Sequence, residues 1–208
     1  MKLYGNPGWG SAIVDLQLTW YGLAFEPVTI GNVFADAKAA ASLRAVNPLA
    51  QMPTLILDDG TVLTESAAIT LYLAELTGRS DLVPGGDSVD RARFLRWLIF
   101  LVTNIYPCFT FADDPARFVD IEAARAPFKA KVDTHAEKLW RLVEAEAGAP
   151  WFLGERMSAI DCYIAVMSRW RPKREWFADH APKLHAIALR AEEDPKLAES
   201  WARNVPDW

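Results

Sequence analysis

The chain of 208 residues is long enough for one large or two small domains with a proper core. Its 51% hydrophobic and 24% charged residues are typical of a globular protein, and its net charge of -5 argues against a nucleic-acid or anionic-membrane surface. It begins without an apolar leader, its longest apolar run (97–102) is too short to span a bilayer, and Cys108 and Cys162 form no CxxC or metal pattern. We therefore expect a cytoplasmic protein with reduced thiols and no metal, membrane span or nucleic-acid partner.

The first part of the chain predicts strands and helices in alternation. Residues 2–4 are a short strand pattern, and turn formers then lead into an apolar helix over 9–22. Residues 26–30 are typical of a second strand, and the alanine-rich residues 36–46 of a second helix. A strand, a helix and a strand in succession imply that the two strands pair in parallel.

A hairpin and a proline come next. Met52-Pro53 opens an apolar run at 54–57, where a proline at the first position of a strand is tolerated. Local sequence alone favours a trans bond, because only about 5–6% of X-Pro bonds in folded proteins are cis. A cis bond would turn the peptide outward and free the N–H and C=O of Met52 for an extended ligand. Asp-Gly at 59–60 predicts a hairpin that joins 54–57 to an antiparallel strand at 61–63.

Glu65 and Ser66 stand at the start of a third helix, which the apolar spacing of residues 67–73 predicts. Unpaired N–H groups at a helix start favour an anion near Ser66, and the carboxylate of Glu65 suits an ammonium. Together the two residues match an amino acid zwitterion. The alternative is structural: Ser66 caps the helix and Glu65 complements its dipole.

Turn formers at 78–87 predict a linker between a domain at 1–77 and a domain at 88–208. No strand pattern persists beyond the linker, so the second domain should be all-helical. Its helical segments lie near 89–105, 115–147, 158–170 and 182–193, broken at Pro107, Pro127, Pro150, Pro172 and Pro182.

The sharpest signal in the second domain is a capping box. Ser158 and Asp161 have the spacing of an N-cap and its reciprocal partner, and Met157 can pack onto Cys162 across the helix start. This role is structural, because a buried helix start needs its N–H groups satisfied from within the protein. A basic and aromatic stretch follows, which we interpret as a solvated helix end: Arg169, Trp170, Arg171, Lys173, Arg174 and Trp176.

These motifs resemble the cytosolic glutathione S-transferase family over nearly the whole chain. The resemblance is carried by Asn47-Pro48, Gln51-Met52-Pro53, the hairpin, Glu65-Ser66-Ala67-Ala68-Ile69 and the capping box preceded by Gly154. It implies a thioredoxin-like N-terminal domain, βαβαββα with a mixed sheet, followed by an all-helical domain, and it implies a homodimer.

The resemblance also assigns a glutathione site. The backbone of Met52 beside Pro53 would hold the cysteine of the tripeptide, Glu65 and Ser66 its γ-glutamyl end, and Gln51 would lie near its glycyl half. Glutathione would be a co-substrate, without a metal.

The resemblance further implies thiol activation at the start of the first helix. Serine-type members use a hydroxyl in this region, a role that would fall to Ser11, with the backbone N–H groups of Gly10 and Ser11 as further donors. The sequence departs from other members, which have a cysteine where this chain has Gly10 or a hydroxyl where it has Trp9. Ser11 could instead be a plain N-cap.

An apolar pocket between the domains would hold the second substrate. Tyr106 and Phe109 lie in an aromatic stretch that Pro107 should take out of regular helix, with Trp97 near its start, and Trp9 should overhang the same cleft. The alternative for these aromatic residues is the core.

Two classes of function remain open. The first is a transferase that joins the glutathione thiolate to a hydrophobic electrophile, with peroxidase or lyase side activity. The second is a non-catalytic glutathione-binding or regulatory relative. Turnover with an electrophile separates them.

Overall fold

The computed structural model describes residues 1–205. The elements of the N-terminal part are, in chain order, β1 (Lys2–Gly5), α1 (Ser11–Tyr21), β2 (Glu26–Thr29), α2 (Ala37–Arg44), β3 (Thr54–Ile56), β4 (Val62–Leu63) and α3 (Ser66–Thr77). The helices that follow are α4 (Arg91–Phe100), α5 (Tyr106–Asp113), α6 (Glu122–Glu146), α7 (Ala159–Met167), α8 (Arg174–His180), α9 (Pro182–Glu193) and α10 (Ala198–Asn204). Three short turns of helix complete the list: a π turn at Leu101–Ile105 and 3₁₀ turns at Pro115–Arg117 and Pro195–Leu197.

The four strands form a mixed sheet in the order β2-β1-β3-β4. β1 pairs in parallel with β2, with Leu3 opposite Pro27, and antiparallel with β3, with Leu3 opposite Leu55. β3 and β4 form the predicted hairpin, in which Gly60 adopts a φ of 86° that a side chain would disfavour. The βαβαββα order and the mixed sheet confirm the predicted thioredoxin-like domain.

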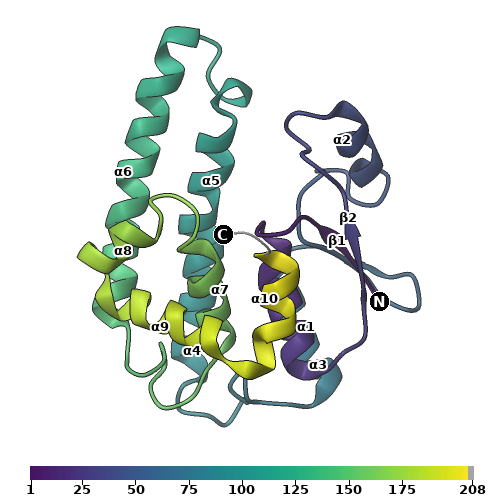
Figure 1. The fold of residues 1–208 in the computed structure, drawn as a ribbon, viewed down its shortest axis with the longest axis vertical. Helices are drawn as coiled ribbons and strands as arrows, with labels where there is room; N and C mark the ends of the chain where they lie inside the picture. The colour runs from purple at the N-terminus through teal and green to yellow at the C-terminus, as the bar shows by residue number, and fades with distance from the viewer. Residues whose placement is uncertain (206–208) are drawn as a thin grey trace.

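α1 and α3 lie side by side between the sheet and the helical domain, and α2 stands apart from them (Figure 1). α1 ends as predicted at Gly22, whose φ of 69° is left-handed. Residues 78–90, between α3 and α4, contain neither helix nor strand. The exact division of the chain into domains there stays a prediction.

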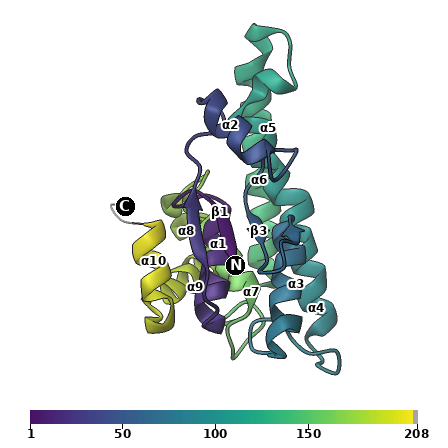
Figure 2. The same cartoon turned by 90° about the vertical axis from the view of Figure 1, so that its right-hand side faces the viewer.

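The helical domain is organised around α7, all nine residues of which are buried. α7 contacts α1, α4 and α9, and Figure 2 shows α7 low in the molecule, between α9 and the pair α3 and α4. The predicted capping box is present: the carboxylate of Asp161 accepts hydrogen bonds from the N–H of Ser158 at 2.7 Å and the N–H of Phe152 at 2.8 Å. The Ser158 hydroxyl donates to the same carboxylate at 3.0 Å. Burial, against the effect of these bonds, raises the pKa of Asp161 to about 6.

Two of the predicted helix breaks are wrong. The chain continues as α5 through Pro107, because the missing proline N–H falls where a π turn at Leu101–Ile105 has already displaced the hydrogen-bond pattern. α6 runs for 25 residues through Pro127. The buried residues that anchor α6 all lie in its second half, around Trp140, so the bond lost at Pro127 falls on the weakly packed half.

The helical run Arg91–Asp113 is apolar and long enough to cross a membrane by length and composition. Within residues 1–205 it is the one helix that meets this test. Core helices of soluble proteins meet it too, and Phe94, Trp97 and Leu98 of this run belong to the common core of the two domains.

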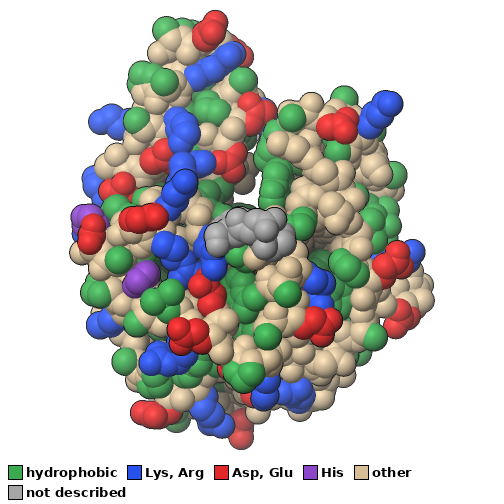
Figure 3. Space-filling view, in the orientation of Figure 1, with side chains coloured by type: hydrophobic (Ala, Val, Ile, Leu, Met, Phe, Trp, Pro, Cys, Tyr) green, Lys and Arg blue, Asp and Glu red, His purple; other side chains and the backbone are tan. Residues whose placement is uncertain are grey.

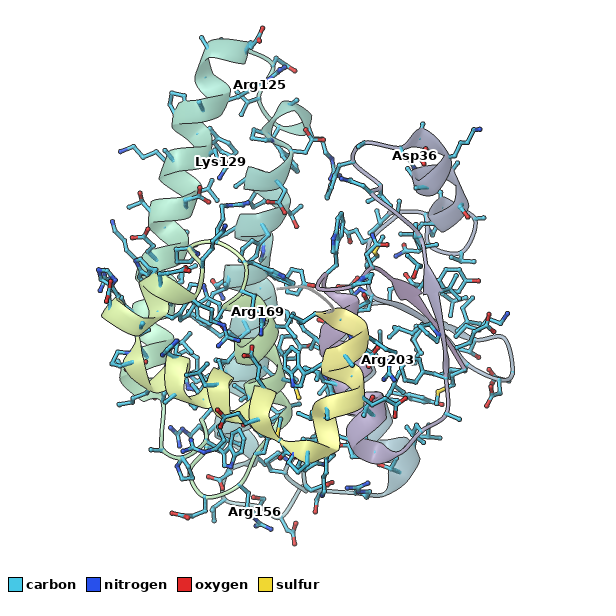
Figure 4. The ribbon with its side chains drawn as sticks, in the orientation of Figure 1. Asp36, Arg125, Lys129, Arg156, Arg169 and Arg203 are labelled. Carbon is cyan, nitrogen blue, oxygen red and sulfur yellow. The ribbon has the colours of Figure 1, made fainter. Side chains whose placement is uncertain are left out.

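The C-terminal helix α10 is fastened to α1 by a buried carboxylate. Asp15 on α1 accepts from Arg203 at 2.7 Å and from the Ser200 hydroxyl at 2.5 Å. Figure 4 shows Arg203 on α10, alongside α1. Together with the shared core, this contact holds the start of α1 in a fixed position against the helical domain.

Candidate functional site

A cleft of about 700 Å³ lies between the two domains. Figure 3 shows the surface hollowed between the column of α5 and α6 and the lobe that carries α2, with hydrophobic side chains along the notch. The cleft is lined by the loop before α1, the segments around Val33 and Asn47, the start of α3, the α4–α5 run, and the loop after α7. Of the predicted site residues, these segments bring together Trp9, Gly10, Gln51, Met52, Pro53, Glu65, Ser66, Tyr106 and Phe109.

The Met52-Pro53 bond is cis. The loop before it is held by the amide of Asn47, which donates to the carbonyl of Gln51 and to the Thr54 hydroxyl, both at 3.0 Å. The N–H and C=O of Met52 have no hydrogen-bond partner among residues 1–205. A fixed loop therefore presents one unpaired donor and one unpaired acceptor at the wall of the cleft.

The side chain of Glu65 is also unpaired within the described part of the chain, and it lines the cleft. It makes no capping hydrogen bond to α3, and Ser66, which the structural alternative made the cap, is the first residue of the helix itself. Its backbone has φ 63° and ψ 104°, a conformation rare outside glycine that proteins keep mainly at functional sites.

Ser66 is the first residue of α3 and only 7% exposed. Its N–H, like that of every first-turn residue, has no partner within the helix, and its carbonyl accepts from the Thr70 hydroxyl at 2.9 Å. Beneath it, the Thr70 hydroxyl lies 3.4 Å from that of Tyr163 on the buried helix α7. Tyr163 of α7 thus lies against the first turns of α3, whose start lines the cleft.

Ser11 does not line the cleft. Its hydroxyl donates to the carbonyl of Asn6 at 3.0 Å and accepts from the N–H of Asn6 at 3.1 Å, and the residue is 4% exposed. The close approach requires glycine at position 5, since a Cβ there would lie 2.0 Å from the Ser11 hydroxyl. The expected contact between this hydroxyl and a bound sulfur does not fit the orientation, because both hydrogen-bonding functions of the hydroxyl are used to hold the loop.

Unlike the Ser11 hydroxyl, the first backbone N–H groups of α1 have no hydrogen-bond partner within residues 1–205. The N–H groups of Gly10 and Ser11 donate to no other described residue, and Gly10 lines the cleft. Trp9 stacks on Phe34 with ring centroids 5.7 Å apart and closes one side of the cleft. The arrangement offers the N–H of Gly10 and the positive end of a helix to an anion in the cleft, and the unpaired N–H of Ser11 lies next to it in the chain.

The apolar wall opposite is built from the helical domain. Tyr106 and Phe109 line the cleft, whereas Trp97 does not: it is 2% exposed and packs edge-on against Phe100 and Phe152 in the core. The prediction for Trp97 is wrong because its side chain falls on the opposite side of the helix from Tyr106.

Trp170 is a cleft residue that the sequence analysis missed. Its ring lies edge-on to Tyr106 at 5.5 Å and to Phe109 at 4.9 Å, and its indole N–H donates to the carbonyl of Gly8 at 2.8 Å. The interpretation of this stretch as a solvated helix end was wrong for Trp170 and Arg171. The guanidinium of Arg171 donates to the carboxylate of Asp133 at 2.9 Å. The only sequence feature that pointed to a role for this stretch in the cleft was the alternation of aromatic residues with arginines.

Burial perturbs the acidity of Tyr106 in the cleft and of Cys108 beside it. Burial, then the neighbouring Tyr163 and Glu65, raises the pKa of the Tyr106 phenol well above its usual range. Burial also raises the pKa of the Cys108 thiol, which donates to the carbonyl of Asn104 at 3.3 Å. Tyr106 therefore keeps its proton at neutral pH, and Cys108 is a free, buried thiol whose raised pKa disfavours the reactive thiolate.

Comparison with known proteins gives consistent matches. Residues 11–76 match the model of the family described as Glutathione S-transferase, N-terminal domain. The chain is 38% identical over 207 residues to the "Uncharacterized GST-like protein YncG" of Escherichia coli strain K12, with 98% of each chain covered.

Solved structures agree with this. A glutathione transferase homologue from Sulfitobacter, with bound glutathione, has the same fold with a TM-score of 0.82 at 24% identity, covering 95% of each chain. A sphingomonad glutathione S-transferase complexed with glutathione is 28% identical with a TM-score of 0.69, covering 96% of each chain.

Proposed function

The chain belongs to the glutathione S-transferase family, and from this premise we propose that it joins the thiolate of glutathione to a hydrophobic electrophile. One observation carries the proposal. The unpaired backbone of Met52 and the unpaired carboxylate of Glu65 line the same cleft as Gly10, whose free N–H lies at the start of α1. A tripeptide with a free ammonium, an amide backbone and a thiol has groups to match all three.

The cysteine residue of glutathione pairs with the backbone of Met52 as a short antiparallel strand would. This mode needs one donor and one acceptor that the protein leaves unused, beside Pro53. Backbone pairing fixes the direction of the peptide, so one end of glutathione points to α3 and its sulfur to α1.

The γ-glutamyl end is held by charge. Its ammonium pairs with Glu65, and its carboxylate accepts from the N–H of Ser66 at the positive end of α3. Gln51, which is exposed and lines the same cleft, is the partner for the glycyl half.

The sulfur lies at the start of α1. A thiol with a pKa of about 8.5 needs a shift of about 1.5 units, or roughly 2 kcal/mol, to be half ionised at pH 7. Hydrogen bonds to a charged group are worth about 1.5–3 kcal/mol, and a helix dipole about 0.3–1 kcal/mol more. Two N–H groups, from Gly10 and Ser11, can meet that requirement. The Ser11 side chain acts indirectly, by holding the loop through Asn6.

The electrophile lies against the apolar wall formed by Tyr106, Phe109 and Trp170, with Trp9 at the side. Aromatic faces of this kind accept flat apolar molecules and exclude water from the thiolate. We also propose, from family membership, that the chain forms a homodimer, works in the cytoplasm, and divides into domains at 1–77 and 88–208 around a linker at 78–87. Glutathione is a co-substrate, and the reaction needs no metal.

Binding tests the site first. Glu65→Gln should weaken glutathione binding in isothermal titration calorimetry by about 10–150-fold, which is the loss of one charge-assisted contact. Glu75→Gln is the matched control, because Glu75 is exposed on the same helix outside the cleft. An analogue of glutathione without the α-amino group should bind wild type and Glu65→Gln equally well. Equal loss with both ligands would remove Glu65 from ammonium binding.

Turnover tests the reaction. Conjugation of glutathione with a chloro-dinitrobenzene, followed by absorbance, should be catalysed by the wild-type protein and weakened by Glu65→Gln in proportion to binding at low glutathione. Tight glutathione binding without turnover across a panel of electrophiles would favour the second class of function, a binding or regulatory protein. The occupied hydroxyl of Ser11 is the observation that keeps this second class open.

A further inference from the structure

We propose that the hydroxyl of Tyr106, which enters the cleft from the helical domain, donates the side-chain hydrogen bond to the glutathione sulfur. This inference rests on the proposed function and adds a catalytic residue to it. At the start of α1 the side chains of positions 10 and 11 do not serve the purpose, since position 10 is glycine and the Ser11 hydroxyl is bonded to Asn6.

The position of the hydroxyl follows from the space around Gly10. A Cβ added to Gly10 would lie 1.8 Å from the Tyr106 hydroxyl oxygen, 3.2 Å from the ring carbon that bears it, and 3.0 Å from the carbonyl oxygen of Met52. The phenol therefore occupies the place that a side chain at position 10 would take. It lies beside Gly10, close to the carbonyl of Met52, and so borders the part of the cleft where the proposed function requires the sulfur to come.

The hydroxyl is available as a donor. Among residues 1–205 it has no hydrogen-bond partner, although the residue is half-buried. Its raised pKa means that the phenol keeps its proton and donates it in a hydrogen bond without transferring it. The thiol proton of glutathione leaves to solvent, the thiolate receives the hydrogen bond, and the sulfur electron pair then forms the bond to the electrophile as the leaving group departs.

The helix is irregular at the point where it presents this ring. The N–H of Tyr106 donates to the carbonyl of Leu101, the i→i−5 bond of the π turn, and Pro107 follows with no N–H to donate. Such single π turns inside α-helices are frequent at functional sites. The turn leaves Leu101 and Ile105 in the core and sets Tyr106 and Phe109 toward the cleft.

The ring is also held from the side. Trp170 contacts Tyr106 edge-on, and its indole N–H bonds the carbonyl of Gly8 in the loop before α1. The phenol and the helix start that it faces are thus tied to the same tryptophan, so their separation is fixed by packing and by one hydrogen bond.

Tyr106→Phe tests the proposal with little structural disturbance, because it keeps the ring and its contact with Trp170 and removes an oxygen that bonds no described residue. The pKa of bound glutathione is read from the ultraviolet absorbance of its thiolate as pH is varied. We expect this pKa to rise by about one to two units and kcat/KM at neutral pH to fall about 10–100-fold, with the rate recovering as pH is raised. The Kd for glutathione below its thiol pKa should not change.

Tyr72→Phe is the control for the substitution itself. Tyr72 is half-buried on α3 and does not line the cleft, so its pH profile and thiol pKa should match those of the wild type. An unchanged thiol pKa in Tyr106→Phe, with wild-type glutathione binding, would overturn the assignment of Tyr106 while leaving the proposed function intact. A loss of rate confined to some electrophiles, at unchanged thiol pKa, would also overturn it, since the hydroxyl would then contact the electrophile. A wild-type protein that binds no glutathione would overturn both proposals.

Discussion

Replacing Gly10 with alanine measures how closely Tyr106 lies against the first turn of α1. Gly10 has φ -56° and ψ -24°, an ordinary helical conformation, so the alanine backbone is unstrained. The new methyl group would lie 1.8 Å from the Tyr106 hydroxyl oxygen, about half of a van der Waals contact, and the phenol would have to move. Overpacking of this kind lowers the free energy of unfolding by about 1–3 kcal/mol.

A double-mutant cycle isolates that contact from everything else at the position. In Tyr106→Phe the oxygen is gone, and the nearest ring atom is the carbon at 3.2 Å, which needs a shift of only a few tenths of an ångström. The contact of the methyl group with the Met52 carbonyl at 3.0 Å is present in both backgrounds and cancels. Gly10→Ala should therefore be about 1–2 kcal/mol less destabilising in the phenylalanine background.

The four proteins are compared by urea unfolding, with the slope of the free energy against urea held as a check that the unfolded states are alike. Effects that add within about 0.5 kcal/mol would refute the geometry, since residues out of contact behave in that way. A coupling of the expected size would place the phenol over Gly10 in solution, independently of any ligand.

Three further substitutions have defined outcomes. Asp161→Ala should lower the free energy of unfolding by about 3 kcal/mol in urea, because it leaves two buried N–H groups unpaired, and a loss below about 1 kcal/mol would contradict the structural role of the capping box. Lys173→Gly should raise the free energy of unfolding by about 1 kcal/mol, because Lys173 has φ 78° and ψ 166°, which glycine adopts without strain. Lys173→Ala should not raise it, and equal effects of the two substitutions would argue against strain at this position. Ser11→Ala should lower the free energy of unfolding by about 1–2 kcal/mol, because the hydrogen bonds to Asn6 are lost. It should leave the thiol pKa of bound glutathione within a few tenths of a unit. A large rise in that pKa at unchanged stability would put the Ser11 hydroxyl at the sulfur.

Local chemistry accounts for what the sequence predicted well. The Asp-Gly hairpin, the left-handed Gly22, the capping box at Ser158 and the helix start at Ser66 each depend on residues within a few positions of one another. The βαβαββα order follows from such signals one after another, and it is the order that the structure has.

Side-chain direction and distant contacts could not be predicted in this way. Whether Ser11 faces the cleft depends on how close β1 brings Asn6 and on the missing side chain of Gly5. The contact of Tyr106 with Gly10 joins the two domains. It cannot be predicted from the sequence around either residue, because the two lie far apart in the chain.

The helix ends predicted at two prolines were wrong, because tertiary packing outweighed the local preference of proline to end a helix. A π turn before Pro107 and the anchored second half of α6 after Pro127 both let the helix continue. Trp170 was missed for a related reason, since its partner Gly8 lies at the other end of the chain.

A crystal structure with bound glutathione tests the central claim most directly. The account predicts an extended tripeptide paired with the backbone of Met52, its ammonium at Glu65, and its sulfur within hydrogen-bonding reach of the Gly10 and Ser11 N–H groups and the Tyr106 hydroxyl. Glutathione bound elsewhere, or with its sulfur turned away from the start of α1, would contradict it.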